Sequence, residues 1–133
     1  MTEKAVFSFD KLTIGMAFPS HQFKLDRDTV IGYTKAVEDK GSYPDGALPP
    51  MFVAARVMSM LAEDLALPPG TIHISQEFAF MHKAYLDETL SSSANVSNKQ
   101  SRGKLNIAAV DINVTNQTRD TILSGKCSFL FPV

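Results

Sequence analysis

The strongest pattern along the chain is a run of apolar residues at helical spacing between Leu48 and Leu67. Seven of them recur every three or four positions, which marks one face of an α-helix: Met51, Ala54, Ala55, Met58, Leu61, Ala62 and Leu65. Phe52, Val53, Val57 and Met60 cover much of the remaining circumference. A helix that is apolar nearly all round is typical of a buried position, so we expect this helix to lie inside the domain.

Prolines mark both ends of this helix. Pro49 and Pro50 suit its first turn, where a missing backbone N–H would have no partner in any case. The Pro-Pro-Gly sequence at residues 68–70 prevents the helix from continuing beyond Leu67. The sequence therefore predicts one long, well-delimited helix in the middle of the chain.

After Gly70 the apolar period changes from about 3.6 to two, which predicts β-strands. Four strands are expected, at residues 71–80, 89–97, 105–115 and 121–131, with turns at 98–104 and 116–120. In the first strand, Ile72, Ile74, Phe78 and Phe80 are expected to share one face. A change of phase at Ala108 and Ala109 indicates a β-bulge in the third. The polar positions are rich in serine and asparagine, so we expect one side of the sheet to contact water.

The part of the chain that precedes the long helix has weaker signals. Residues 1–18 are interpreted as an arm, and residues 20–25 as a short edge strand. Asp26 is expected to cap a helix that runs to about Asp39, and residues 40–47 have the composition of a loop. A loop at the start of a buried helix is a common place for a binding pocket. Residues 1–133 are thus predicted to form a single α+β domain, with an antiparallel sheet wrapped around one long central helix.

Composition narrows the function classes. The 133 residues suffice for one domain with a substantial core, and 44% hydrophobic and 20% charged residues are ordinary values. A net charge of −1 gives no electrostatic basis for binding nucleic acid or an anionic membrane, and no apolar run approaches the roughly 20 residues of a membrane span. No signal-peptide pattern is present at the N-terminus, so we expect a cytoplasmic location. Cys127 has no partner for an internal disulfide, and metal-ligand spacing is absent.

Short motifs occur along the chain in a recognisable order: Gly15, Phe23, residues 28–33 with Ala36, residues 85–90, Lys99 with Arg102 and Gly103, residues 114–118, residues 123–126 and Phe129. In this order they resemble the hotdog-fold proteins of the MaoC-like group, the (R)-specific enoyl-thioester hydratases and dehydratases. The resemblance covers most of the chain and implies a hotdog fold that binds an acyl thioester. It implies no separate cofactor, since coenzyme A or the phosphopantetheine of an acyl carrier protein is part of the substrate.

The segment that carries the catalytic residues of this group differs here. Active members have D-x-N-P-x-H before the central helix and a His-Gly pair at the helix start. If Asp39 is aligned with the catalytic Asp, Pro44 stands where the His belongs. If Pro44 is aligned with the proline of the motif, Gly41 and Gly46 stand at the acid–base positions. A Pro-Pro pair at residues 49–50 replaces His-Gly, which is similar to the non-catalytic half of two-hotdog dehydratases and to the substrate-binding subunit of heterodimeric ones.

The chemistry of hydration leads to the same expectation. Adding water to an enoyl thioester needs a base to activate the water and a donor to polarise the carbonyl. No His lies in the loop at residues 40–47, and Pro50 removes one backbone N–H from the helix start. The acid–base dyad of the group is therefore expected to be missing.

The candidate site residues lie in the loop and the first turns of the long helix. Asp39 is the candidate acid–base residue, and its alternative role is a solvated carboxylate at a helix end. The candidate substrate-binding residues are Tyr43, Asp45, Pro50, Met51, Phe52 and Ala55. For Tyr43 and Asp45 the alternative is a role in the turn, and for the apolar residues of the helix it is core packing.

Other chemically capable residues are interpreted as ordinary surface or strand residues. His73 and His82 are not favoured as bases, and Glu63 lies too far along the helix to act at its start. Lys99, Arg102 and Lys104 form a charged turn, whose alternative role is to contact the phosphates of coenzyme A or a carrier protein.

Three functions remain open. The first is an acyl-thioester-binding subunit, acting as a homodimer or beside a catalytic hotdog subunit in a heterodimer. The second is a self-sufficient (R)-specific enoyl-coenzyme A hydratase or dehydratase that uses Asp39. The third is an acyl-coenzyme A thioesterase, which needs a carboxylate or His over the helix start. Dimerisation is expected because residues 71–80 carry apolar side chains along a strand that would otherwise leave a bare sheet edge.

Overall fold

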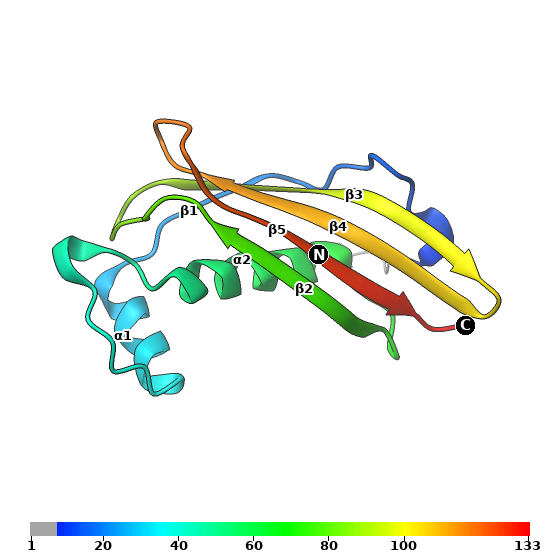
Figure 1. Ribbon diagram of the computed structural model, residues 1–133, viewed down its shortest axis with the longest axis horizontal. Helices are drawn as coiled ribbons and strands as arrows, with labels where there is room; N and C mark the ends of the chain where they lie inside the picture. Colours follow the sequence, from blue (N-terminus) through cyan, green and yellow to red (C-terminus); the bar gives the residue numbers. More distant parts are fainter. Residues whose placement is uncertain (1–7) are drawn as a thin grey trace, which may run out of the picture.

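The structure, a computed structural model, describes residues 8–133 and has one long helix lying against an antiparallel sheet (Figure 1). In chain order its elements are the 3-10 turn η1 (Phe9–Lys11), β1 (His21–Phe23), α1 (Arg27–Ala36), the 3-10 turn η2 (Pro44–Gly46), α2 (Pro50–Leu65), β2 (Ile72–Phe80), β3 (Leu90–Arg102), β4 (Leu105–Thr115) and β5 (Thr121–Phe131). The strands form a single sheet in the order β1-β3-β4-β5-β2, and each neighbouring pair is antiparallel. The predicted α+β class is confirmed.

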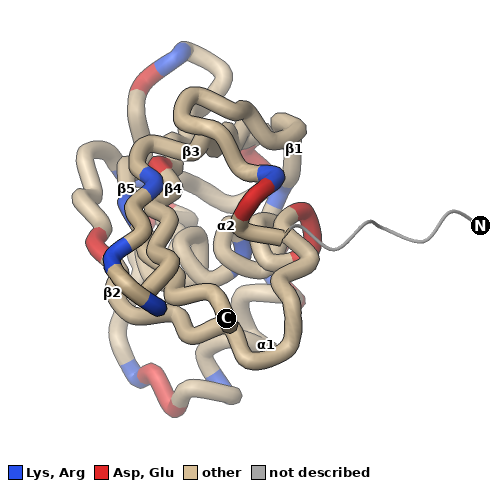
Figure 2. Tube along the Cα trace, turned by 90° about the vertical axis from the view of Figure 1, so that its right-hand side faces the viewer, with Lys and Arg blue, Asp and Glu red and all other residues tan. Residues whose placement is uncertain are grey.

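The sheet curves over α2, so that the helix lies in its concave side (Figure 2). Acidic and basic residues are interspersed along the trace in this view, and neither sign dominates the face. The core lies between the helix and the sheet. Its helical half consists of Val53, Ala54, Val57, Met60, Leu61 and Leu65, and its sheet half includes Leu90, Val96, Val110, Ile112, Val114, Leu123, Cys127 and Phe129.

The prediction that α2 is buried nearly all round is wrong for this chain by itself. One side of the helix is exposed, including Met51, Ala55 and Ala62, while Met58 is half-buried. The reason is geometric, because a single sheet covers one side of a helix, and among the described elements only α1 contacts the helix elsewhere, through Tyr33 and Phe52 at its first turn. The apolar residues on that side therefore face outward.

The ends of α2 follow the prolines. Pro49 is the N-cap and Pro50 the first helical residue. At the other end the helix stops at Leu65, because Ala66 adopts a left-handed conformation with φ of 43°. The helix thus ends two residues before the predicted limit, and Pro68 follows as expected.

The short helix α1 begins where the sequence predicts. The carboxylate of Asp26 accepts a hydrogen bond from the Thr29 N–H at 2.8 Å, which satisfies a free donor of the first turn. This bond lowers the pKa of Asp26 below its ordinary value. The helix ends at Ala36, three residues before the expected limit, because Glu38 takes a left-handed φ of 55°. Asp39 consequently belongs to the loop.

The strands β4 and β5 have the predicted bounds, whereas β3 is longer than expected. It continues to Arg102 and pairs with β4 up to the hairpin, so most of the predicted charged turn is strand. The bulge expected at Ala108 and Ala109 lies instead across the ladder in β3, where Ser97 is the extra residue between Val96 and Asn98. The alternation in β4 continues without a break, with Ala108 and Val110 both facing the core.

The strand β2 forms an edge of the sheet and also contains an irregularity. The register with β5 shifts between His73 and Ser75, which places Ile74 in a bulge. Three residues of β2, Gln76, Phe78 and Phe80, pair with Cys127, Gly125 and Leu123 of β5. Cys127 and Leu123 face the core, so the three residues of β2 share the helix-facing side. The prediction that Ile72 shares this face is therefore wrong, and Ile74 has no partner in the ladder.

The water-facing side of the sheet carries an apolar row that was not predicted. Ile107, Leu130 and Ile72 are cross-strand neighbours on β4, β5 and β2. Ile72 is 55% exposed, and Leu105 next to the row is 51% exposed. The outer face therefore contacts water, as expected, but it is not polar throughout.

The predicted arm falls partly on residues 1–7, which lie outside the described residues. The remainder packs against the sheet rather than projecting from it. Leu12 and Phe18 are buried, Ala17 bridges to Asn95, and Lys99 donates a hydrogen bond from Nζ to the Leu12 carbonyl at 2.8 Å.

Candidate functional site

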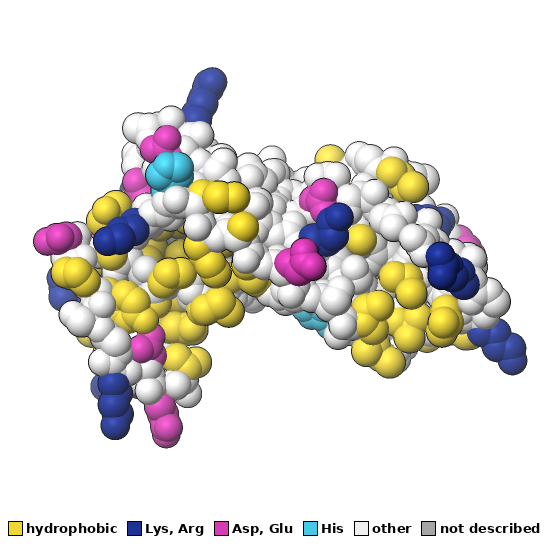
Figure 3. All heavy atoms as spheres, viewed as in Figure 1, with side chains coloured by type: hydrophobic (Ala, Val, Ile, Leu, Met, Phe, Trp, Pro, Cys, Tyr) yellow, Lys and Arg dark blue, Asp and Glu magenta, His cyan; other side chains and the backbone are white. Residues whose placement is uncertain are grey.

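An apolar cavity of about 200 Å³ opens beside the first turn of α2. We call it the helix-start cavity, and its lining residues are Leu48, Pro50, Val53, Phe80, Met81, His82, Lys83, Ala84 and Ile122. They come from Leu48 and the first turn of α2, from the end of β2 with the segment that follows it, and from β5. Hydrophobic side chains gather over this region of the surface in Figure 3.

Backbone hydrogen bonds hold the walls of this cavity in place. The Leu48 N–H donates to the Ala84 carbonyl at 2.8 Å, and Ala47 bridges to Tyr85. The Met81 N–H donates to the Ile122 carbonyl at 2.8 Å. The chain entering α2 and the chain leaving β2 are thus fixed to each other and to β5, so the cavity belongs to the fold.

His82 is oriented by the strand beside it. Its Nδ1 lies 2.8 Å from the carbonyl oxygen of Thr121. A carbonyl only accepts hydrogen bonds, so Nδ1 carries the proton and Nε2 carries the lone pair in the neutral ring. Within residues 8–133, Nε2 has no hydrogen-bond partner.

The start of α2 offers few free backbone donors. Pro50 has no N–H, and the N–H groups of Phe52 and Val53 both donate to the Pro49 carbonyl, at 3.0 and 3.4 Å. Of the first turn, only the amide of Met51 is left to bind another group.

Asp39 lies in the loop after α1 and not at the helix-start cavity. Its Oδ1 accepts a hydrogen bond from the Gly41 N–H at 2.7 Å, and its Oδ2 accepts one from the Tyr43 hydroxyl. These bonds, the one from Tyr43 first, hold the pKa of Asp39 below its ordinary value, and the same contact raises the pKa of Tyr43. Both carboxylate oxygens are therefore engaged in holding the loop.

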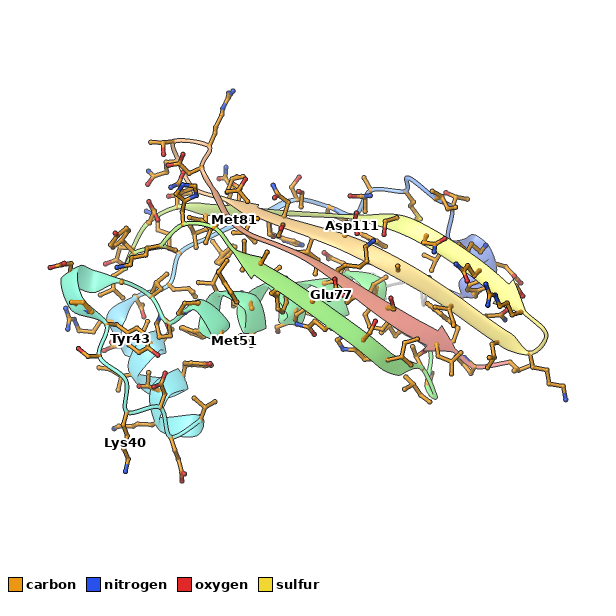
Figure 4. The ribbon with its side chains drawn as sticks, in the orientation of Figure 1. Lys40, Tyr43, Met51, Glu77, Met81 and Asp111 are labelled. Carbon is orange, nitrogen blue, oxygen red and sulfur yellow. The ribbon has the colours of Figure 1, made fainter. Side chains whose placement is uncertain are left out.

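The other candidate residues do not lie together. Only Pro50 lines the helix-start cavity. Phe52 is half-buried and stacks on Tyr33 of α1, with ring centroids 4.5 Å apart, while Asp45 is exposed in the turn η2 with a left-handed φ of 60°. Met51 is 54% exposed. Figure 4 shows Met81 on one side of α2, with Met51 and Tyr43 toward the other.

Ala55 lies in a separate, open groove between α2 and β2. The groove has a volume of about 390 Å³ and is lined by Ala55, Met58, Ser59, Ala62, Leu67, His73, Gln76 and Phe129. It shares no residue with the helix-start cavity. A larger side chain at Ala55 would therefore project into the groove and not into the core.

Sequence reasoning did not identify the residues that line most of the cavity. Met81, His82 and Lys83 follow β2 in a short stretch without periodicity, and His82 was interpreted as a surface residue. The only sequence signal was a histidine and a lysine next to an apolar strand. Their approach to α2 depends on the pairing of β2 with β5, which is not readable from the local sequence.

Among the remaining charged candidates, Lys99 is in structural contacts, whereas Arg102 and Lys104 are exposed at the β3–β4 hairpin. Lys99, besides its bond to Leu12, places its ammonium 4.6 Å from the centre of the Phe9 ring. An aspartate–histidine pair does occur, between His21 of β1 and Asp64 of α2 at 2.6 Å, but neither residue lines the helix-start cavity. Within residues 8–133 there is no group of three or more potential metal ligands, and no helix there combines the length and apolarity needed to span a membrane.

No family model matches the sequence, and no curated protein matches it. Solved structures are similar over almost the whole chain. The (R)-hydratase from A. caviae, involved in PHA biosynthesis, has a TM-score of 0.77 and 15% identity over 92% of this chain and 98% of that one. The MaoC-like dehydratase from Rhodospirillum rubrum has a TM-score of 0.72 and 16% identity, over 93% and 96% of the two chains.

A third similar structure is a complex of two different subunits. The ChsH1–ChsH2 complex from Mycobacterium tuberculosis gives a TM-score of 0.73 and 12% identity, over 90% of this chain and 98% of that one. Similarity at such low identity shows the fold alone. The chain therefore has the hotdog fold, which it shares with these hydratases and dehydratases.

Proposed function

We propose that this protein is an acyl-thioester-binding hotdog subunit of an enoyl hydratase or 3-hydroxyacyl dehydratase system, without an acid–base dyad of its own. The observation that carries the proposal is the helix-start cavity, which is largely apolar and has no carboxylate among its lining residues. An acyl-coenzyme A or an acyl carrier protein would supply the thioester, with no separate cofactor. The cytoplasmic location expected from the sequence belongs to the same proposal.

The contacts of Asp39 favour this function over a self-sufficient enzyme. A general base works best when its pKa lies near the working pH. The hydrogen bonds from Tyr43 and Gly41 lower the pKa of Asp39 and so make it a weaker base. Asp39 also lines a different, shallow surface pocket, together with residues of α1 and Lys40. A thioesterase would have to rely on His82, since no carboxylate lines the helix-start cavity.

Exposed apolar surface supports a protein partner. The edge strand β2 exposes Ile72 and Ile74, which are 55% and 46% accessible, and the groove around Ala55 lies between the helix-facing side of the same strand and α2. An unpaired edge with apolar side chains is a ready site for strand pairing. Pairing there would also cover the side of α2 that the sheet of this chain leaves open. A second copy or a catalytic hotdog subunit fits this surface.

Calorimetric titration of the purified protein with butyryl-coenzyme A and with free coenzyme A tests the proposed function. We expect binding of the acyl form that exceeds binding of coenzyme A. In parallel, crotonyl-coenzyme A should show no rapid loss of enoyl absorbance when only this protein is added. Rapid hydration that disappears in Asp39→Asn would reject the proposal in favour of a self-sufficient enzyme.

Three tryptophan variants at similarly exposed positions locate the site. Met81 lines the helix-start cavity and is 55% exposed, Met51 is 54% exposed on the other side of the helix, and Leu105 is 51% exposed on β4. Met81→Trp should abolish acyl binding at an unchanged melting temperature, whereas Leu105→Trp should bind like the wild type. If Met51→Trp blocks binding and Met81→Trp does not, the ligand enters beside Tyr43 and Phe52, as the sequence alone suggested.

A further inference from the structure

The helix-start cavity contains two polar side chains whose hydrogen-bonding roles differ. Seven of its nine lining residues are apolar, and the other two are His82 and Lys83. A lysine ammonium only donates hydrogen bonds. The free nitrogen of His82, in contrast, is an acceptor in the neutral ring, because Nδ1–H donates to Thr121.

The acceptor at His82 restricts which acyl groups fit the cavity well. Saturated and enoyl chains carry no hydrogen-bond donor, and the thioester carbonyl only accepts. An acyl chain with a hydroxyl group has a donor for Nε2 in addition to the carbonyl that accepts from Lys83. His82 is exposed in the free protein, so a ligand that fills the cavity takes water away from Nε2, and only a hydroxylated chain replaces that hydrogen bond.

The volume of the cavity limits the length of the chain. Typical small-molecule pockets measure roughly 300–1,000 Å³. The helix-start cavity, at about 200 Å³, is smaller and ends against buried Leu48, Val53 and Ile122. A short acyl group fills it, while a long one would have to displace core residues of α2 and β5.

We propose that His82 determines specificity in this cavity by accepting a hydrogen bond, at Nε2, from the hydroxyl group of a short hydroxyacyl thioester. This inference rests on the proposed function, since it concerns the acyl group bound at the same site. Thr121 fixes the tautomer of His82 through its carbonyl, and Ile122 fixes the backbone of the same segment through bonds from the amides of Met81 and His82. The ring is therefore held in place before a ligand enters.

Comparison of 3-hydroxybutyryl-coenzyme A, butyryl-coenzyme A and crotonyl-coenzyme A by calorimetry tests the inference. The titrations are made at mildly alkaline pH, where an imidazole is neutral. We expect the hydroxylated ligand to bind roughly three- to tenfold more tightly than the other two, as one net hydrogen bond predicts. The His82→Phe variant should lose the preference, so that its affinities for the three ligands become similar.

Two matched variants separate this role from general effects. His73→Phe changes a histidine that lies outside the cavity, with its ring centroid 4.9 Å from that of Phe129, and should retain the preference. Lys83→Met should lower the affinity for all three ligands by a similar factor. Because His82→Phe also loses the bond to Thr121, an imidazole ¹⁵N spectrum of the wild type gives an independent measurement. The Nε2 resonance of His82 should shift with 3-hydroxybutyryl-coenzyme A and not with butyryl-coenzyme A.

The outcomes distinguish this inference from the function on which it rests. If the wild type binds butyryl- and 3-hydroxybutyryl-coenzyme A equally, and Nε2 shifts with neither, His82 is not a specificity residue although acyl binding stands. If the wild type binds none of the three ligands, the proposed function fails and the inference fails with it.

Discussion

Gly125 of β5 lies directly opposite Phe78 of β2, and the aromatic ring occupies the space that a side chain at Gly125 would fill. A Cβ atom built on Gly125 would stand 2.6 Å from Cδ1 of Phe78 and 2.9 Å from the Glu77 carbonyl oxygen. Ordinary carbon contacts are about 3.5–4.0 Å. Close packing across the β2–β5 pair therefore requires glycine at this position for reasons of space.

The substitution Gly125→Ala should destabilise the protein by about 1–3 kcal/mol through overpacking, measured by chemical denaturation. Gly32→Ala provides the matched control. Gly32 lies inside α1 with no atom within 4 Å of the added Cβ, so alanine there should stabilise the helix by roughly 0.5–1 kcal/mol. Phe78→Ala in the Gly125→Ala background should restore only part of the loss, since the Glu77 carbonyl remains. Equal effects at the two glycines would contradict this interpretation of the β2–β5 contact.

The hydrogen bond between Tyr43 and Asp39 should make stability depend on acidic pH. Because the pKa of Asp39 is lowered in the folded state, its contribution is present above the ordinary pKa of about 3.8 and is lost as pH falls below it. Tyr43→Phe should raise the pKa of Asp39, measured by NMR titration of its carboxyl carbon. The gap in melting temperature between wild type and variant should narrow as pH drops below 4.

Tyr85→Phe is the control for that titration, because Tyr85 is 41% exposed and has no contact with Asp39. It should leave the pKa of Asp39 unchanged. If Tyr43→Phe also leaves that pKa unchanged, the loop at residues 40–47 is held by other contacts. Asp39 is then again a candidate general base.

Features that depend on adjacent residues could be predicted from the sequence. The Asp26 cap, the prolines at the start of α2 and the bounds of β4 and β5 all agree with the structure, because each follows from local backbone chemistry or from a period-two pattern. The exposed side of α2 could not be predicted in this way. Apolar residues around a helix do not reveal whether the covering surface comes from the same chain or from a partner.

Long-range pairing explains what sequence reasoning missed at the site. His82 reaches the helix-start cavity because the segment after β2 bonds to Thr121 and Ile122, some 40 residues away. The bulge at Ser97 was assigned to the wrong strand for a related reason. A change of phase in one strand of a ladder does not indicate which strand carries the extra residue, since small Ala109 is buried on the outer face without breaking the pattern.

Cys127 should be inert in the folded protein and titrate only after unfolding. Burial, with a smaller contribution from the Asp111 charge, raises the pKa of its thiol from about 9 to about 12. As pH rises, the thiol of the unfolded chain loses its proton first. The contribution of the neutral, buried thiol to folding stability is therefore complete below pH 9 and is lost between pH 9 and 12. Cys127→Ala should therefore show a weaker fall of melting temperature across pH 9–11 than the wild type. A thiol reagent at pH 8 should react only in denaturant, and prompt reaction of the native protein would show that the core opens at β5.

The last prediction concerns the open edge of the sheet. If β2 pairs with a second copy, the purified wild type should sediment as a dimer at micromolar concentration. Ile74→Lys, which adds a charge in the bulge of this edge strand, should shift the protein towards monomer. Leu105→Lys introduces the same charge on the interior strand β4, where Leu105 is 51% exposed against 46% for Ile74. The Leu105→Lys protein should remain dimeric. Dissociation by Leu105→Lys alone would place the contact on the apolar row of the outer face. A wild type that sediments as a monomer, alone and in the presence of a candidate catalytic hotdog, would show that the edge does not form an interface.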